Sequence, residues 1–170
     1  MVINMMKKRT KGVLVYLVRD LLKESQVLVI KYKNGGSKGY YDIPGSEVSK
    51  EETLVETAAN SFKKDTGIEV TNLVYKGNAI FEYPNEIYDL SVYVTRDYNY
   101  EQKPKDFETH TALWMPVEKV IFQEKTFPTI TLLSHMFKDQ VRVHMYLDND
   151  ERLISIEEKW FTNKLKYYSI

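Results

Sequence analysis

The chain has 170 residues, a length that fits one globular domain with a sizeable core. Its 24 Lys and Arg residues equal its 24 Asp and Glu residues, so the composition gives no indication of a polyanionic partner such as nucleic acid. No cysteine is present, which excludes disulfides, thiolate metal sites and cysteine nucleophiles. Any chemistry must therefore use oxygen and nitrogen atoms.

The sequence contains no segment that is typical of membrane insertion or secretion. No stretch approaches about 18–20 uninterrupted apolar residues, and the start, MVINMMKKRTKG, lacks an apolar core of signal-peptide length. We expect a cytoplasmic, soluble protein without a membrane partner. The sequence leaves the oligomeric state open, a homodimer included.

Two runs rich in β-branched residues, 11–18 and 26–32, predict a β-hairpin at the start of the chain. Residues 33–39, KNGGSKG, follow as a turn or mobile loop, because Asn-Gly-Gly allows backbone conformations that few other residues adopt.

Helical periodicity begins after Ser49, which with Glu52 fits a capping box, and Gly67 is the expected stop. The apolar residues that recur at spacings of three and four, and so line one face of this helix, are Leu54, Val55, Ala58, Ala59 and Phe62.

The second half of the chain alternates strands and a helix. Strand-forming runs cover 68–76 and 78–95, the second with a turn at Pro84-Asn85, and a short strand covers 112–115. Residues 124–139 predict a second helix. The order indicates an α+β fold in which helices cover a mixed sheet.

The tail predicts a hairpin of residues 142–147 and 152–156 around Asp148-Asn149-Asp150. Ile156, Trp160 and Leu165 then have the spacing of a short helix. No linker or repeat interrupts the chain, so we expect a single domain over 1–170, with a core at about 11–139 and a C-terminal extension at about 140–170.

The segment 39–68 resembles the signature of the Nudix hydrolases, G-x5-E-x7-R-E-U-x-E-E-x-G-U, in which U is aliphatic. Counting back from Gly67-Ile68 places Glu52 at the first glutamate and Phe62 at U, while Pro44-Gly45 resembles the Pro-Gly-Gly turn of the family. The departures stand at the opening glycine, the Arg-Glu pair and the paired glutamates, and they are Ser46, Asn60, Ser61, Lys64 and Asp65. The chain thus resembles a Nudix protein with a degenerate box.

The resemblance implies a Nudix-like α/β/α sandwich with a mixed sheet and an added C-terminal hairpin. It also implies hydrolysis of a phosphoanhydride bond in a nucleoside diphosphate linked to another group, in the manner of the branch that cleaves oxidised nucleoside triphosphates. Such chemistry uses Mg²⁺ or Mn²⁺ held by carboxylates, which neutralises charge on the phosphates and activates water.

The polar face of the predicted helix departs from this requirement. Residues 61, 64 and 65 project side by side, and here they are Ser61, Lys64 and Asp65 instead of three glutamates. A lysine in a cation site is repulsive, and one carboxylate remains. We expect metal affinity to fall sharply, so that no metal is bound or hydrolysis is weakened.

The first glutamate of the box, Glu52, has two interpretations. The resemblance gives it a catalytic role braced by an arginine, whereas Asn60 stands in the arginine's place and would leave Glu52 a capping role alone. It is equally an N-terminal carboxylate favoured by the helix dipole. Glu56 is expected on the solvent side.

A loop before the strand at 112–115 supplies further candidates. By resemblance, Glu108 ahead of Trp114 joins Asp65 as a catalytic residue and metal ligand. His110 could act as a base, since imidazole titrates near neutrality, or be an exposed loop residue.

Basic and aromatic side chains suit the two ends of a nucleotide. Lys31, Lys33, Lys38 and Lys64 are candidates for phosphate binding, with an ordinary basic loop as the alternative for the first three. Tyr16, Tyr83, Tyr88 or Tyr93 could stack on a base, or belong to the core.

Three functions remain open. One is a Nudix-type hydrolase weakened at its metal site. The second is a catalytically inactive Nudix fold that binds a nucleotide, with Lys64 contacting phosphate, or binds a protein. The third is an interaction domain that uses the C-terminal hairpin and Trp160-Phe161 as a partner surface.

Overall fold

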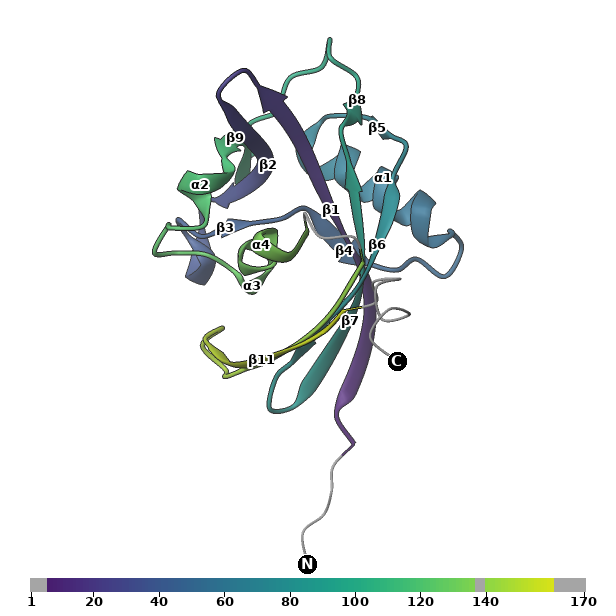
Figure 1. Ribbon diagram of the computed structural model, residues 1–170, viewed down its shortest axis with the longest axis vertical. Helices are drawn as coiled ribbons and strands as arrows, with labels where there is room; N and C mark the ends of the chain where they lie inside the picture. Colours follow the sequence, from purple (N-terminus) through teal and green to yellow (C-terminus); the bar gives the residue numbers. More distant parts are fainter. Residues whose placement is uncertain (1–5, 137–139, 161–170) are drawn as a thin grey trace, which may run out of the picture.

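The computed structural model describes residues 6–136 and 140–160 (Figure 1). These residues form an α+β fold with a mixed nine-stranded sheet in the order β11-β10-β6-β7-β1-β2-β3, with β4 paired to β1 and β9 to β2. The strands β5 and β8 form a separate small ladder. None of the helices in the described ranges has the length and apolar character needed to cross a bilayer.

The predicted N-terminal hairpin is confirmed and is longer than expected. It consists of β1 (Lys8–Leu21) and β2 (Glu24–Tyr32), which pair antiparallel. Alternate residues of β1 enter two separate cores: Val13, Val15 and Leu17 face the helix α1, and Leu14, Tyr16 and Val18 pack with residues of α3 and α4. Helices therefore cover both faces of the sheet, as Figure 1 shows.

Helix α1 (Leu54–Thr66) ends at Gly67 as predicted, but its start was predicted wrongly. Gly67 adopts a left-handed conformation, φ 79°, and its N–H bonds the carbonyl of Lys63. The capping box is made by Thr53 and Glu56, not by Ser49 and Glu52. Both pairs fit the same sequence pattern, and Thr53 immediately precedes the first helical residue.

The buried face of α1 also differs from the predicted stripe. Ala58 and Phe62 are fully buried against β1, whereas Leu54 and Val55 are 39% and 48% exposed. Thr57 and Thr66 are buried beside them instead. The apolar residues of the first turn are therefore only partly covered, and the core contact of α1 is made further along the helix.

Strands after α1 follow the prediction with one additional break. The predicted strand 68–76 divides into β5 (Val70–Thr71) and the start of β6 (Val74–Glu82), because Asn72 has φ +50°. The turn at Pro84-Asn85 connects β6 to β7 (Glu86–Thr95), as expected. β8 (Asp97–Tyr98) and β9 (His110–Pro116) follow, and β9 pairs with β2.

The single helix predicted at 124–139 is wrong. The structure has α2 (Val117–Val120), α3 (Pro128–Thr131) and α4 (Leu133–Met136), while residues 137–139 lie outside the described ranges. Thr126 forms an isolated bridge with Tyr41, and Phe127 donates its N–H to the carbonyl of Tyr41. This pairing with β3 (Tyr41–Asp42) keeps the chain extended until Pro128 begins α3.

The predicted C-terminal hairpin is confirmed, as β10 (Val141–Leu147) and β11 (Leu153–Trp160). β10 pairs parallel with β6, so the hairpin extends the main sheet (Figure 1). The helix predicted from Ile156 is wrong for residues 156–160, which are part of β11. Leu165 and Phe161 lie outside the described residues, and so does the predicted Trp160-Phe161 surface.

Candidate functional site

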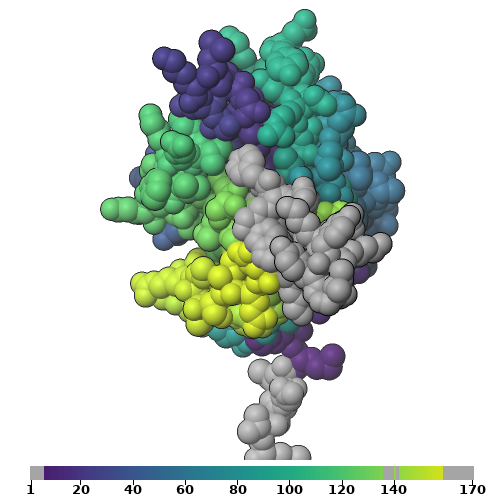
Figure 2. Space-filling model, in the orientation of Figure 1, coloured from purple at the N-terminus to yellow at the C-terminus, as the bar shows by residue number. Residues whose placement is uncertain are grey.

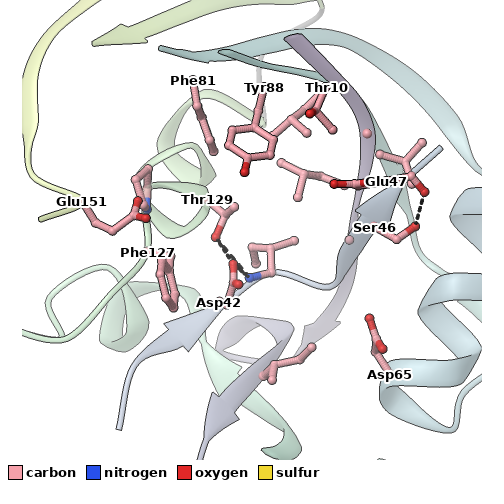
Figure 3. Close-up of a pocket in the computed structure, with 18 of the residues that line it drawn as sticks. Thr10, Asp42, Ser46, Glu47, Asp65, Phe81, Tyr88, Phe127, Thr129 and Glu151 are labelled. Atoms are coloured by element: carbon pink, nitrogen blue, oxygen red, sulfur yellow. Dashed lines mark hydrogen bonds between the residues drawn. The ribbon is translucent and has the colours of Figure 1, made fainter. Parts of the chain in front are cut away.

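A cavity of about 320 Å³ lies beside β1, on the side of the sheet covered by α3 (Figure 3). It extends from Asp65, in the last turn of α1, to Asp42 at the end of β3. Its volume is at the lower end of the range of about 300–1,000 Å³ that is typical of small-molecule sites. Its walls combine aromatic rings with carboxyl groups, which suits a flat polar ligand.

Asp42 lines this cavity, where three neighbouring groups hold its carboxylate. It accepts three hydrogen bonds: from the Thr129 hydroxyl (2.5 Å), from the backbone N–H of the next residue, Ile43 (2.8 Å), and from the Tyr32 hydroxyl (3.1 Å). Burial raises the pKa of Asp42 from 3.8 to about 6, against the lowering effect of these three donors. The negative charge of Glu151 raises it further. Asp42 can therefore donate or accept a hydrogen bond near neutral pH.

Five aromatic rings line the walls, those of Tyr32, Phe81, Tyr83, Tyr88 and Phe127. Tyr32 and Phe127 meet edge to face at 5.8 Å, and Tyr83 and Tyr88 do so at 5.9 Å. Of the tyrosines predicted to stack on a base, Tyr83 and Tyr88 line the cavity. Tyr16 and Tyr93 are buried in the two cores instead.

Asp65 points into the other end of the cavity (Figure 3). Burial raises the pKa of Asp65, while the charges of His110 and Lys64 lower it. His110 is not the exposed loop residue of the sequence prediction: it begins β9, is partly buried and stacks on Phe107. Its Nε2 lies 2.8 Å from the backbone oxygen of Asp65. A carbonyl only accepts, so this nitrogen donates, and His110 holds the end of α1 in place.

The remaining polar face of α1 does not fit a divalent metal. The Ser61 hydroxyl is directed to the Ala58 carbonyl, and Lys64 is exposed beside Asp65. Within the described residues, no group of three or more His, Asp or Glu side chains is arranged to hold a metal ion. Mg²⁺ and Mn²⁺ prefer several oxygen ligands, whereas this face offers one carboxylate and one ammonium.

Glu52 has a partner that the sequence interpretation denied it. Asn60 donates a hydrogen bond from Nδ2 to Glu52 Oε1 at 2.7 Å. Asn60 thus binds the carboxylate from the position where the box has arginine, and the capping role belongs to Glu56. The prediction that Glu52 only caps the helix is wrong, because the helix starts after it.

The turn that opens the box is retained for a steric reason. A Cβ on Gly45 would lie 2.5 Å from the Val13 carbonyl oxygen, so only glycine allows β4 (Gly45–Glu47) to approach β1 this closely. Ser46, at the opening position of the box, lines the cavity and donates from its hydroxyl to the Glu47 carbonyl. The scaffold of the box is therefore intact around altered side chains.

The other predicted site residues lie apart from the cavity. Glu108 is exposed, and its backbone carbonyl accepts from Asn34. Lys33 is bound to the carbonyl of Phe107 at 2.7 Å and forms an ion pair with Asp106. Of the four lysines predicted to bind phosphate, three have exposed side chains: Lys31, which lies over the Tyr41 ring, Lys38 and Lys64.

Comparison with known proteins decides the family. A model of the NUDIX domain matches residues 8–136. The chain belongs to the Nudix family. This Nudix chain is 26% identical over 104 residues to the zebrafish (Danio rerio) oxidized purine nucleoside triphosphate hydrolase, covering 61% of this chain and 67% of that protein. The resemblance read from the degenerate box is thereby confirmed.

Solved structures share the Nudix fold at low sequence identity. The mMutator MutT protein from Bacillus halodurans superposes with a TM-score of 0.67 and 17% identity, covering 89% of this chain and 97% of that one. The NUDIX domain of Shewanella oneidensis NrtR, crystallised with ADP ribose, gives 0.61 and 14%, covering 76% and 86%. The predicted α+β Nudix sandwich is confirmed.

Sequence reasoning missed most of the cavity. Asp42 and Tyr32 come from β3 and β2, Thr129 from α3, and Glu151 from the turn of the C-terminal hairpin. One signal was present for Asp42, a carboxylate directly before the apolar Ile43 and the Pro-Gly turn. Glu151 gave no such signal, because it is one of three acidic residues in a polar turn.

Proposed function

We propose that this Nudix protein binds a nucleoside diphosphate derivative, with the base in the cavity, and hydrolyses its phosphoanhydride bond slowly. The single observation that carries the proposal is the cavity that links Asp42, among aromatic rings, to Asp65 on the box helix. The rings provide stacking surfaces for a base, and Asp42 provides a hydrogen-bonding group at its edge.

The ligands of related proteins support this class of substrate. The zebrafish relative is named for oxidized purine nucleoside triphosphates, and the Shewanella domain was crystallised with ADP ribose. Both ligands contain a nucleoside diphosphate unit. We infer that the diphosphate lies outside the cavity near Lys64, because the cavity residues described here include no lysine or arginine.

Slow hydrolysis follows from the donor set of α1. Asp65 is the only carboxylate among residues 61, 64 and 65. Lys64 opposes a cation at the same face. The alternative is a protein that binds the nucleotide without turnover. Lys64 favours this alternative, since its ammonium group can contact the phosphates directly at a face that does not hold a metal ion.

The test combines turnover with binding. Purified protein is incubated with nucleoside triphosphates, nucleotide sugars and dinucleotides plus Mg²⁺ or Mn²⁺, and binding is measured by calorimetry with and without chelator. We expect slow turnover that Asp65→Asn abolishes, while Asp97→Asn, an exposed control, leaves it unchanged. Binding without any turnover, indifferent to chelator and lost in Lys64→Ala, would identify the binding protein instead. If no nucleotide binds, both candidates are wrong.

A further inference from the structure

The cavity has an unusual charge for a nucleotide site. Its described lining residues include five with carboxyl groups and none of Lys, Arg or His; the five are Asp42, Glu47, Asp65, Glu86 and Glu151. Carboxylates with low-dielectric walls repel an anionic group and attract a positive one. The charge of the cavity therefore suits a positively charged group, and not the negatively charged phosphates of a nucleotide.

Glu151 brings the C-terminal hairpin into this cavity. It lies in the turn between β10 and β11 at φ +63°, a conformation that residues other than glycine adopt uncommonly. Its Oε2 accepts a hydrogen bond from the Tyr83 hydroxyl. Figure 3 shows its side chain beside Phe127, on the same side of the cavity as Asp42. The hairpin turn, yellow in Figure 2, thus places a carboxylate at the wall of the cavity.

Two electrostatic features couple Glu151, which is partly buried, to the cavity. Burial raises the pKa of Glu151, with a further increase from the charges of Glu86 and Asp148, although the bond from Tyr83 lowers it. Its charge is also felt by Asp42, whose pKa it raises. Glu151 borders both this cavity and an adjacent surface hollow, whereas Arg152, the next residue, lines only the hollow.

The aromatic rings strengthen the preference for positive charge. The rings line the same space as the carboxyl groups of Asp42 and Glu151; they belong to Tyr32, Phe81, Tyr83, Tyr88 and Phe127. A cation over an aromatic face is attracted by the ring quadrupole, and desolvation increases this attraction. Rings combined with carboxylates favour a flat ligand that is positively charged over a neutral one of the same shape.

We propose that Glu151 is a specificity-determining residue which, with Asp42, makes the cavity select a base that carries positive charge, such as an N-alkylated purine. This inference rests on the proposed function in that it names the class of base that the nucleotide carries. The hairpin, which lies beyond the matched NUDIX domain at 8–136, then contributes to ligand choice as well as to the sheet.

Calorimetry at pH 7.5 tests the inference with the matched pair 1-methyladenosine, which is cationic, and adenosine, which is neutral. Each is used as the free nucleoside and as the 5′-diphosphate. The proteins are wild type, Glu151→Gln, and Asp150→Asn as control. Asp150 belongs to the same turn and carries the same charge, but it lines the adjacent hollow and not the cavity.

We expect wild type to bind a cationic nucleoside at least about tenfold more tightly than adenosine. Glu151→Gln keeps an oxygen for the Tyr83 hydroxyl but loses the charge, and should reduce this preference below about threefold, while Asp150→Asn leaves it unchanged. Equal binding of cationic and neutral bases by wild type would overturn the inference, and so would a preference that Glu151→Gln retains.

The free nucleosides and the diphosphates together distinguish selectivity for a cationic base from the proposed nucleotide function. If 1-methyladenosine binds in a Glu151-dependent way but neither diphosphate binds more tightly than its nucleoside, the base site is supported and the nucleotide function is wrong. If both diphosphates bind equally well, the function is supported and the selectivity is wrong. If no nucleoside and no nucleotide binds, both are overturned.

Discussion

The polar face of α1 and the cavity beside β1 both carry carboxylates, but the two regions surround them differently. On α1, Asp65 stands next to an exposed lysine, and the Ser61 hydroxyl is directed to its own helix. In the cavity, Asp42 is partly buried, accepts three hydrogen bonds and faces aromatic walls. The carboxylate of Asp42 is thus held by several segments of the chain, whereas the box face of α1 presents one carboxylate beside an ammonium.

The difference has a physical origin. Cavity residues are fixed by packing and by hydrogen bonds to other segments, so each substitution there disturbs several neighbours. The Ser61 hydroxyl bonds a carbonyl of its own helix and Lys64 is exposed, so we expect substitutions there to leave the fold intact. The substitutions below change one region at a time, from the largest expected effect to the smallest.

Restoring carboxylates on α1 should have the largest effect. In the double variant Ser61→Glu/Lys64→Glu, the face has three carboxylates at spacings of three and four, which is the donor set that Mg²⁺ prefers. We expect Mg²⁺-dependent phosphoanhydride hydrolysis to rise by about two orders of magnitude. Formation of the nucleoside monophosphate during a Mg²⁺ titration measures the rate.

Lys63→Glu is the matched control for this variant, because Lys63 lies on the same helix and pairs with exposed Glu69 instead of facing Asp65. It reverses one charge without adding a ligand, and hydrolysis should stay at the wild-type rate. An unchanged rate in the double variant, despite measurable Mg²⁺ binding, would mean that the α1 face is not what limits activity.

Neutralising Asp42 should change stability. Its pKa is raised from 3.8 to about 6, so its contribution to the free energy of unfolding is complete below pH 4 and is lost as pH rises through 6. Asp42→Asn removes that loss and keeps an oxygen for Thr129 and Ile43. The free energy of unfolding of the variant, compared with that of wild type, should therefore rise by roughly 2–3 kcal/mol from pH 4 to pH 8. Denaturant unfolding at both pH values measures the gain.

The exposed carboxylate of Asp106 should show the opposite pH dependence of stability. The bonds from Lys33 and Thr111 lower the pKa of Asp106, so its stabilising effect is present at neutral pH and is lost on acidification. Asp106→Asn should therefore lose stability at pH 8 and not gain it. If Asp42→Asn shows no gain at high pH, the buried carboxyl is better solvated than the cavity geometry indicates.

The smallest effect concerns the start of α1. Thr53→Ala removes the hydroxyl that accepts from the Glu56 amide and should lower the free energy of unfolding by about 1 kcal/mol. Ser49→Ala is the control, since Ser49 lies outside the helix and bonds only the amide of Glu51. Thermal or denaturant unfolding distinguishes the two. Equal losses would place the helix start nearer to Ser49.

Much of the fold was predictable because its signals are local. The β-branched runs gave the first hairpin, the turn at Pro84-Asn85 gave the break between β6 and β7, and Gly67 gave the end of α1. The errors arose where two local signals competed, as with the two capping patterns at Ser49 and Thr53. They also arose where pairing with a distant strand overrode helical periodicity, as in the segment before Pro128.

The candidate site was predictable only along α1. The box placed Asp65, Lys64 and Glu52 correctly on or beside one helix, because their spacing is fixed by the helix itself. The bond from Asn60 to Glu52 was missed, since the family pattern supplied an arginine as the expected partner. Catalytic roles for Glu52, Asp65 and Glu108 stay predictions that the substitutions above and the turnover assay address.

By itself, the sequence determined the framework of this protein: a Nudix box whose turn, helix and glycine stop are intact, with Lys64 in place of a metal-binding carboxylate. These features follow from residues close together in the chain, whose geometry a single turn or helix imposes. Only the tertiary structure decided that Asp42 and Glu151, 109 positions apart in the numbering, line one acidic and aromatic cavity. Their meeting depends on the parallel pairing of β10 with β6, which no local pattern encodes.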